Sequence, residues 1–206
     1  MSDLITVQGV VLSATQVGEY DRRIVLLTRE RGKISAFAKG ARRQNSPLMA
    51  VTSPFVFGTF TLFEGRTSYN LSHVAVQYQF TELSAVQPGI YYGYYFLELA
   101  DYFGQEGTDE KAMMNLLYVS IRALLNPEID DRLVRCIYEL SAMAEQGMCP
   151  QLTGCISCGD PGEGGAVWFS QEAHGLLCDP CRRQGGDARK ISAGTLYAMR
   201  FIVSTP

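Results

Sequence analysis

The sequence predicts an α+β protein of several domains: a small β-barrel or sandwich, then a helical bundle, then an element organised by four cysteines. Three observations predict this order. Short β-rich runs separated by turn residues fill residues 1–80. From residue 88 onward the apolar residues recur at three- and four-residue steps, the period of an amphipathic helix. Two C-x-x-C pairs then occur within residues 151–190, a stretch that is poor in aliphatic side chains.

The β-rich part is expected to hold five strands. They are predicted over residues 5–12, 23–28, 33–39, 55–63 and 68–80. Turn-prone segments separate them, among them Gly18 to Asp21 and Glu30 to Gly32. Five short strands with turns of this kind are typical of a small barrel or sandwich.

The helical part is expected to span residues 81–150 and to contain three helices. They should begin near Gly89, Asp109 and Asp131, where a proline, a capping residue or a pair of acids precedes an apolar stripe. Cys136 lies beside the stripe of the third helix and is expected to be a buried thiol. Residues 191–206 are expected to start a further helix, after the cysteine element of residues 151–190.

The charge of the chain is unevenly distributed. The formal net charge is −3, which by itself argues against a nucleic-acid-binding protein. Residues 1–80, however, carry nine Lys and Arg against five Asp and Glu, a net charge of +4. The other 126 residues carry nine bases and sixteen acids, a net charge of −7. The predicted barrel is therefore basic and the remainder acidic.

The most concentrated basic segment is Lys39-Gly40-Ala41-Arg42-Arg43, which is followed by polar residues and Pro47 and is expected to be a loop. A cationic loop beside a barrel strand can follow a phosphate backbone without reading base sequence. The alternative is a solvated surface loop. Three aromatic residues near the strands could stack on bases, although each could equally be a packing residue: Tyr20, Phe37 and Tyr69.

The two C-x-x-C pairs, Cys155 with Cys158 and Cys178 with Cys181, are separated by nineteen residues. This spacing predicts a tetrahedral zinc site with four cysteine ligands, in which Gly159 eases the turn after the first pair. Four sulfur ligands fill the coordination sphere, so the zinc would be structural. An iron–sulfur cluster or a redox dithiol is the alternative.

Enzyme motifs are missing from the sequence. His73 and His174 are the two histidines, and neither has a nucleophile and an acid in a recognisable order. Phosphate-loop, dinucleotide-binding and H-E-x-x-H motifs do not occur. We therefore expect no enzymatic activity. The longest apolar run, residues 89–97, is too short to span a bilayer, and the start of the chain has no basic signal region, so a cytoplasmic protein is expected.

Two segments together resemble a known family. GEYDRRIVLLTRERGKIS (residues 18–35) and AKGARR (residues 38–43) are similar to the N-terminal signature of the RecO family of bacterial DNA-repair and recombination mediators. The order of barrel, helical bundle, cysteine pairs and a helix opening at Ser192 also fits. The resemblance covers nearly the whole chain.

This resemblance implies an OB-fold barrel over residues 1–80 that binds single- and double-stranded DNA and anneals complementary strands. It further implies loading of the RecA recombinase onto strands coated by the single-strand-binding protein SSB, in the RecF pathway of recombination and the SOS response to DNA damage. RecR and the SSB C-terminal tail are the implied protein partners, and the nucleoid is the implied location. Arg132, Arg135 and the aromatic stripe of residues 91–103 are candidates for contact with that tail.

The family roles fall on ten residues of this sequence. The implied DNA contacts are Arg22, Arg23, Lys33, Lys39, Arg42 and Arg43. The implied zinc ligands are Cys155, Cys158, Cys178 and Cys181. Family members usually continue with more helix after the segment that ends here, so a C-terminal truncation is expected. The competing hypothesis is a zinc-stabilised scaffold that contacts other proteins and not nucleic acid.

Overall fold

The computed structural model describes residues 3–65, 68–160 and 167–204. It contains two compact units, residues 1–138 and residues 139–206, and each is described by itself. The first unit holds a β-barrel and most of a helical bundle. The second holds the end of the last bundle helix, a small sheet, the four cysteines and a final helix.

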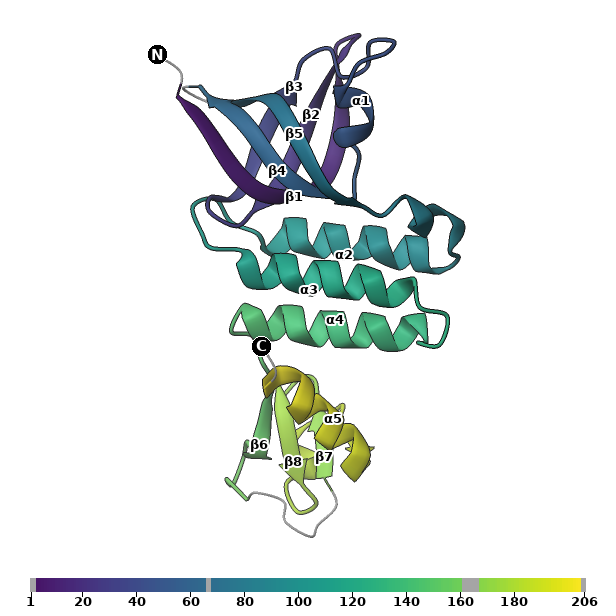
Figure 1. The fold of residues 1–206 in the computed structure, drawn as a ribbon. Helices are drawn as coiled ribbons and strands as arrows, with labels where there is room; N and C mark the ends of the chain where they lie inside the picture. The colour runs from purple at the N-terminus through teal and green to yellow at the C-terminus, as the bar shows by residue number, and fades with distance from the viewer. Residues whose placement is uncertain (1–2, 66–67, 161–166, 205–206) are drawn as a thin grey trace. The chain divides into compact units, whose positions relative to one another are not determined.

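The barrel is closed by five strands in the order β1-β2-β3-β5-β4 (Figure 1). The strands are β1 (Leu4–Val17), β2 (Asp21–Thr28), β3 (Gly32–Ala38), β4 (Val56–Glu64) and β5 (Tyr69–Gln79). Five strands in this closed order are the architecture of an OB-fold, as the family resemblance implies. Of the two architectures that the strand pattern allowed, a barrel and a sandwich, the structure has the barrel.

The core of the barrel comes from alternate residues along each strand. In β3 the buried residues, such as Ile34 and Ala36, alternate with half-buried ones, as a period of two requires. Gly32 opens this strand with a φ of +66°, and a Cβ there would lie 1.9 Å from the backbone oxygen of Gln105. Only glycine therefore fits the turn between β2 and β3.

The barrel is not equally continuous around its circumference. Strand β1 pairs with β4 from Leu4 to Val10 and with β2 from Gly9 to Val17. Strands β3 and β5, by contrast, are parallel and pair only at Ala36 with Tyr69 and Phe37 with Asn70. A four-residue helix, α1 (Leu48–Val51), lies in the connection from β3 to β4, beside β5 (Figure 1).

The bundle helices are α2 (Gly89–Phe103), α3 (Lys111–Leu124) and α4 (Asp131–Glu145), preceded by a 3₁₀ turn, η1 (Thr81–Ala85). Helices α2 and α3 lie side by side (Figure 1). Tyr138 of α4 is fully buried and stacks on Phe96 of α2 with 4.2 Å between ring centroids. Its hydroxyl donates to the Phe96 backbone oxygen at 2.9 Å, which satisfies the only polar atom of a ring otherwise suited to the core.

The sequence pattern predicts a buried stripe on α4 that is partly wrong: Leu133, Val134, Ile137, Leu140, Met143 and Ala144. Val134, Tyr138 and Ala142 are buried, whereas Cys136 is exposed and Leu133 is 55% exposed. Cys136 is therefore not the core thiol that its position beside the apolar residues suggested. The reason is that the large ring of Tyr138, two residues on, takes the inward-facing position of the helix.

The second unit contains a four-stranded sheet in the order β6-β8-β7-β9 and helix α5 (Ala193–Ser204). The strands are β6 (Gln151–Cys155), β7 (Val167–Ser170), β8 (Gly175–Cys178) and β9 (Arg189–Ile191). Leu152, Leu176 and Leu196 of α5 form a small apolar cluster in this unit. Among the described residues, no helix combines the length and the apolar character needed to cross a membrane.

Candidate zinc centre and nucleic-acid interface

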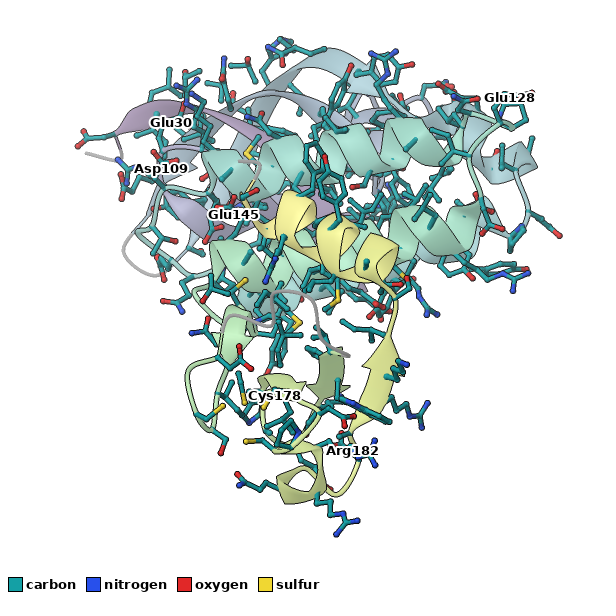
Figure 2. The ribbon with its side chains drawn as sticks, turned by 90° about the horizontal axis from the view of Figure 1, so that it is seen from below. Glu30, Asp109, Glu128, Glu145, Cys178 and Arg182 are labelled. Atoms are coloured by element: carbon teal, nitrogen blue, oxygen red, sulfur yellow. The ribbon has the colours of Figure 1, made fainter. Side chains whose placement is uncertain are left out.

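The four predicted zinc ligands come together in the second unit. Cys155 ends β6 and Cys178 ends β8, which is hydrogen-bonded beside it, and Cys158 and Cys181 lie in the turns that follow. All four Sγ atoms lie within 4.8 Å of one another, and the Cys158 and Cys178 sulfurs are 3.6 Å apart. Figure 2 shows sulfur atoms gathered around the labelled Cys178.

This arrangement fits a tetrahedral metal ion. With metal–sulfur bonds of about 2.3 Å, the sulfurs of a zinc tetrahedron are about 3.8 Å apart, close to the spacing observed. Four thiolates favour zinc or an iron centre over magnesium or calcium, which take oxygen ligands. The four cysteines could therefore hold a metal ion through a complete set of soft ligands.

Each cysteine pair forms a tight backbone turn. Gly159 has a φ of +79° and donates its N–H to the Cys155 oxygen at 2.8 Å, as expected for the glycine after the first pair. Burial raises the pKa of the Cys155 thiol, but backbone N–H groups that include those of Cys178 and Cys158 lower it to about 6. The thiolate, which is the form that binds a metal, is therefore favoured at Cys155, whereas the pKa values of Cys158 and Cys178 are raised.

Trp168 and Arg182 enclose the second cysteine turn. Asp179, between Cys178 and Cys181, accepts a hydrogen bond from the Trp168 indole at 3.1 Å and one from the Arg182 guanidinium at 2.9 Å. The guanidinium lies 4.9 Å from the centre of the indole ring, and Figure 2 labels Arg182 near Cys178. These contacts were not evident from the sequence, because β7 supplies the tryptophan from ten residues upstream of Cys178.

A second support of this unit is Asp187. Its carboxylate accepts hydrogen bonds from the Ser170 hydroxyl and from the backbone N–H groups of Gln171 and Glu172. The Ser170 bond is the largest of the effects that lower the Asp187 pKa below its ordinary value. The carboxylate therefore ties the end of β7 to the segment that leads into β9.

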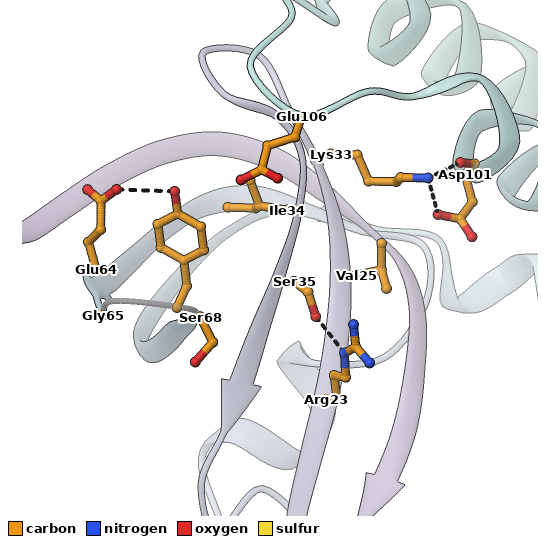
Figure 3. Close-up of a pocket in the computed structure, with 11 residues that line it drawn as sticks. Arg23, Val25, Lys33, Ile34, Ser35, Glu64, Gly65, Ser68, Asp101 and Glu106 are labelled. Atoms are coloured by element: carbon orange, nitrogen blue, oxygen red, sulfur yellow. Dashed lines mark hydrogen bonds and ion pairs between the residues drawn. The ribbon is translucent and has the colours of Figure 1, made fainter.

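The six implied DNA-contact residues divide into two sets. Arg22, Arg23 and Lys33 lie on strands β2 and β3 and donate side-chain hydrogen bonds to other elements of the first unit, whereas the other three lie in the turn after β3. Arg22 donates to the Met49 backbone oxygen at 2.8 Å and to the buried Thr52 hydroxyl at 3.0 Å, so that it holds α1 against β2. Lys33 donates to the Asp101 backbone oxygen and lies 3.3 Å from the Asp101 carboxylate, which joins β3 to α2 (Figure 3).

Arg23 is exposed on β2 and donates from Nε to the Ser35 hydroxyl of β3 at 2.7 Å (Figure 3). It retains its other guanidinium nitrogens for further contacts. Arg22 and Lys33, by comparison, are committed to the connections between elements of the first unit. Sequence alone could not separate these roles, since the partners lie 27 to 68 residues away along the chain.

Lys39, Arg42 and Arg43, which we call the basic trio, are exposed in the turn after β3. In the part of the chain that the structure describes, none of them forms a salt bridge. The turn is nevertheless fixed by two hydrogen bonds of Arg42. Its backbone N–H donates to the Tyr20 backbone oxygen, and its guanidinium donates to the Glu19 backbone oxygen. The basic trio is thus held against the turn between β1 and β2.

Comparison with known proteins decides the family. Residues 1–80 match the family model "Recombination protein O N terminal", and residues 89–206 match "Recombination protein O C terminal". The chain belongs to the RecO family. A RecO relative from Alkaliphilus metalliredigens, named DNA repair protein RecO, is 33% identical over 98% of this chain and 81% of its own length. The DNA repair protein RecO of Symbiobacterium thermophilum is 32% identical over 97% of this chain and 80% of its own length. That of Bacillus pumilus is 33% identical over 86% of this chain and 68% of its own length.

Proposed function

We propose that this chain is a DNA-repair and homologous-recombination mediator that binds single- and double-stranded DNA. In this role it anneals complementary strands and helps to load RecA onto SSB-coated DNA in the RecF pathway. Membership of the RecO family supports the repair role. The single observation that carries the DNA contact is the basic trio, three exposed cations that no carboxylate neutralises within the described residues.

Annealing by such a surface requires no catalytic residue. Cations along one face neutralise the phosphates of two strands, and holding both strands on one protein raises their effective concentration. Residues 1–80 carry a net charge of +4 and the other residues −7, so the potential directs DNA toward the barrel. The cysteines would hold zinc as a structural ion that orders the second unit.

RecR and the SSB tail are the proposed protein partners. The stripe of residues 91–103 presents two kinds of residue: Phe96 and Leu97 are buried, while Tyr91 and Tyr102 are exposed. The exposed tyrosines, together with Arg132 and Arg135 of α4, remain our candidates for contact with the acidic, hydrophobic SSB tail. This part of the proposal rests on the family alone.

Oligonucleotide binding over a salt series tests the DNA contact. Replacing the basic trio with alanine should make the plot of log K against log[salt] shallower by about 2, since each single-strand phosphate contact contributes about 0.7. The matched control replaces three exposed cations elsewhere, R29A/K111A/R183A, and should leave the slope unchanged. An unaltered slope in the trio variant would place the site elsewhere. No binding of the parent chain at low salt would favour the alternative, a zinc-stabilised protein-interaction scaffold.

A further inference from the structure

The barrel offers two grooves to a nucleic acid. OB-folds usually bind oligonucleotides on the face of strands 2 and 3, between the loops that join strands 1 to 2 and 4 to 5. A groove of about 500 Å³ lies on that face, lined by Arg23 and Ser35 among others (Figure 3). A second groove, of about 630 Å³, lies between the β3–α1 connection and β5.

The groove on the usual face is poorly suited to phosphates. Three carboxylates line it, those of Glu64, Asp101 and Glu106, against the two cations Arg23 and Lys33 (Figure 3). Lys33 is already paired with Asp101, and Arg23 is bonded to Ser35. Glu64 is likewise paired with Arg31 at 2.9 Å, so the carboxylates and cations of this groove largely compensate one another and leave no excess of positive charge for a phosphate.

The second groove has the opposite character. Lys39 and Arg43 line it from the β3–α1 connection, and Ser72 and His73 line it from β5. Its described lining includes no carboxylate. The hydroxyl of Ser72 and the imidazole N–H of His73 are hydrogen-bond donors opposite the two cations.

The base of this second groove is apolar. Leu48 and Val51 of α1 and Val74 of β5 line it and belong to the barrel core or pack against it. A duplex presents phosphates outward and keeps its base faces stacked, so it cannot cover such a surface. An unpaired strand exposes sugars and base faces, which can cover apolar side chains while its phosphates meet the cations.

We propose that a single-stranded polynucleotide runs through the groove between the β3–α1 connection and β5, and not along the usual OB-fold face. Ser72 and His73 then form the wall opposite Lys39 and Arg43, the two members of the basic trio that line this groove. This inference rests on the proposed function, because it names the path of the strand and the residues of the second wall. It assigns binding residues on β5 that the sequence motifs did not indicate.

Charge substitutions on β5 of the full chain test this path, with a fluorescent oligonucleotide and its duplex as probes. H73E places a carboxylate in the groove and should weaken single-strand binding about tenfold, because this carboxylate repels the phosphates of the strand. Q77E is the matched control: Gln77 is exposed on the same strand and does not line the groove, so its single-strand affinity should stay within about twofold of the parent. R23A probes the usual face, and a loss of single-strand affinity larger than that of H73E would overturn the path.

A variant that gains affinity is also needed, because a loss of binding could result from misfolding. S72R adds a cation to the groove and should strengthen single-strand binding about threefold, a result that damaged protein cannot give. Cross-linking of a bromodeoxyuridine oligonucleotide, mapped by mass spectrometry, should label the segments of residues 39–51 and 72–74. Labels confined to residues 23–35, or equal affinities for H73E and Q77E, would overturn the path.

The outcomes separate the two proposals. If the trio variant loses binding while H73E and S72R behave as the parent, DNA binding stands and the path through the groove is wrong. If H73E weakens duplex and single-strand binding equally, the single-strand assignment is wrong. If the parent binds neither probe at low salt, the proposed function itself fails.

Discussion

The guanidinium of Arg43 lies over the ring of Tyr20, 5.5 Å from its centre. This contact joins the loop after β3 to the turn between β1 and β2. Tyr20 is 45% exposed, so part of its ring remains accessible. The arginine is therefore oriented by an aromatic ring while its charge stays free of any carboxylate described in the structure.

Replacing Tyr20 with alanine should weaken single-strand binding about three- to tenfold, since an aromatic contact with Arg or a base contributes about 1 kcal/mol. The salt slope should not change, because tyrosine carries no charge. Tyr20→Phe keeps the ring and should bind as the parent does. Fluorescence anisotropy at several salt concentrations measures both quantities, and a changed slope in Y20A would contradict the assignment.

Arg22→Ala should reduce the stability of the first unit. It should leave the salt dependence of DNA binding unchanged. The substitution removes hydrogen bonds to Met49 and to the buried Thr52, and we expect a loss of about 1–3 kcal/mol in the free energy of unfolding. Urea unfolding followed by circular dichroism measures this loss. The comparison is R29A, an exposed arginine, which should unfold as the parent does. A shallower salt slope for R22A with unchanged stability would instead show that Arg22 contacts DNA.

Metal removal should unfold the second unit and leave the barrel folded. Elemental analysis should find one zinc per chain, and a strong chelator should remove it. Trp168, the single tryptophan of the chain, donates to Asp179 inside the second cysteine turn, so its fluorescence should shift to longer wavelength on metal loss. Protein purified without chelator and containing no metal would refute the zinc assignment.

The same experiment has a matched pair of variants. Cys155→Ser should abolish zinc binding, because it removes one of four ligands. Cys149→Ser should bind zinc as the parent does, since Cys149 is exposed and does not belong to the cluster. Equal zinc content in the two variants would mean that the ligand set is wrong.

Asp187 should titrate below the ordinary carboxyl pKa of about 3.9. A depressed pKa in the folded state means that the carboxylate stabilises the fold above the unfolded-state pKa, and that this stabilisation is lost as pH falls through the folded-state value. Asp187→Asn should therefore lower the melting temperature of the second unit at pH 7. NMR titration of the Asp187 carboxyl carbon measures the pKa directly, and a midpoint above about 4 would contradict the role of Ser170.

Much of the architecture follows from local sequence patterns. Alternation along β3, the proline before Gly89 and the spacing of the two cysteine pairs each depend on residues close together in sequence. The expected helix starts therefore agree with the structure to within two residues. The cluster of four cysteines could equally be predicted from the sequence, because two C-x-x-C pairs at this spacing have few other uses.

Contacts between residues far apart in the sequence could not be predicted in the same way. Helix α1 has four residues, too few to give a periodic signal, and it is held by Arg22 from 27 residues away. The assignment of Lys33 to Asp101 depends on how β3 meets α2, which no local pattern encodes. Cys136 was placed on the wrong side of its helix, because the apolar stripe did not include Tyr138.

The short parallel pairing of β3 with β5 has a consequence for the barrel as a whole. Two residue pairs join these strands, so this is the seam at which the cylinder is least strongly closed. Lys39 and His73 lie on opposite sides of the gap beyond it. A ligand that contacts both residues would connect the two sides of the seam. Binding of the ligand and closure of the barrel are then thermodynamically linked. A substitution that loosens the seam should then lower the affinity for the ligand, and binding of the ligand should raise the melting temperature of the barrel.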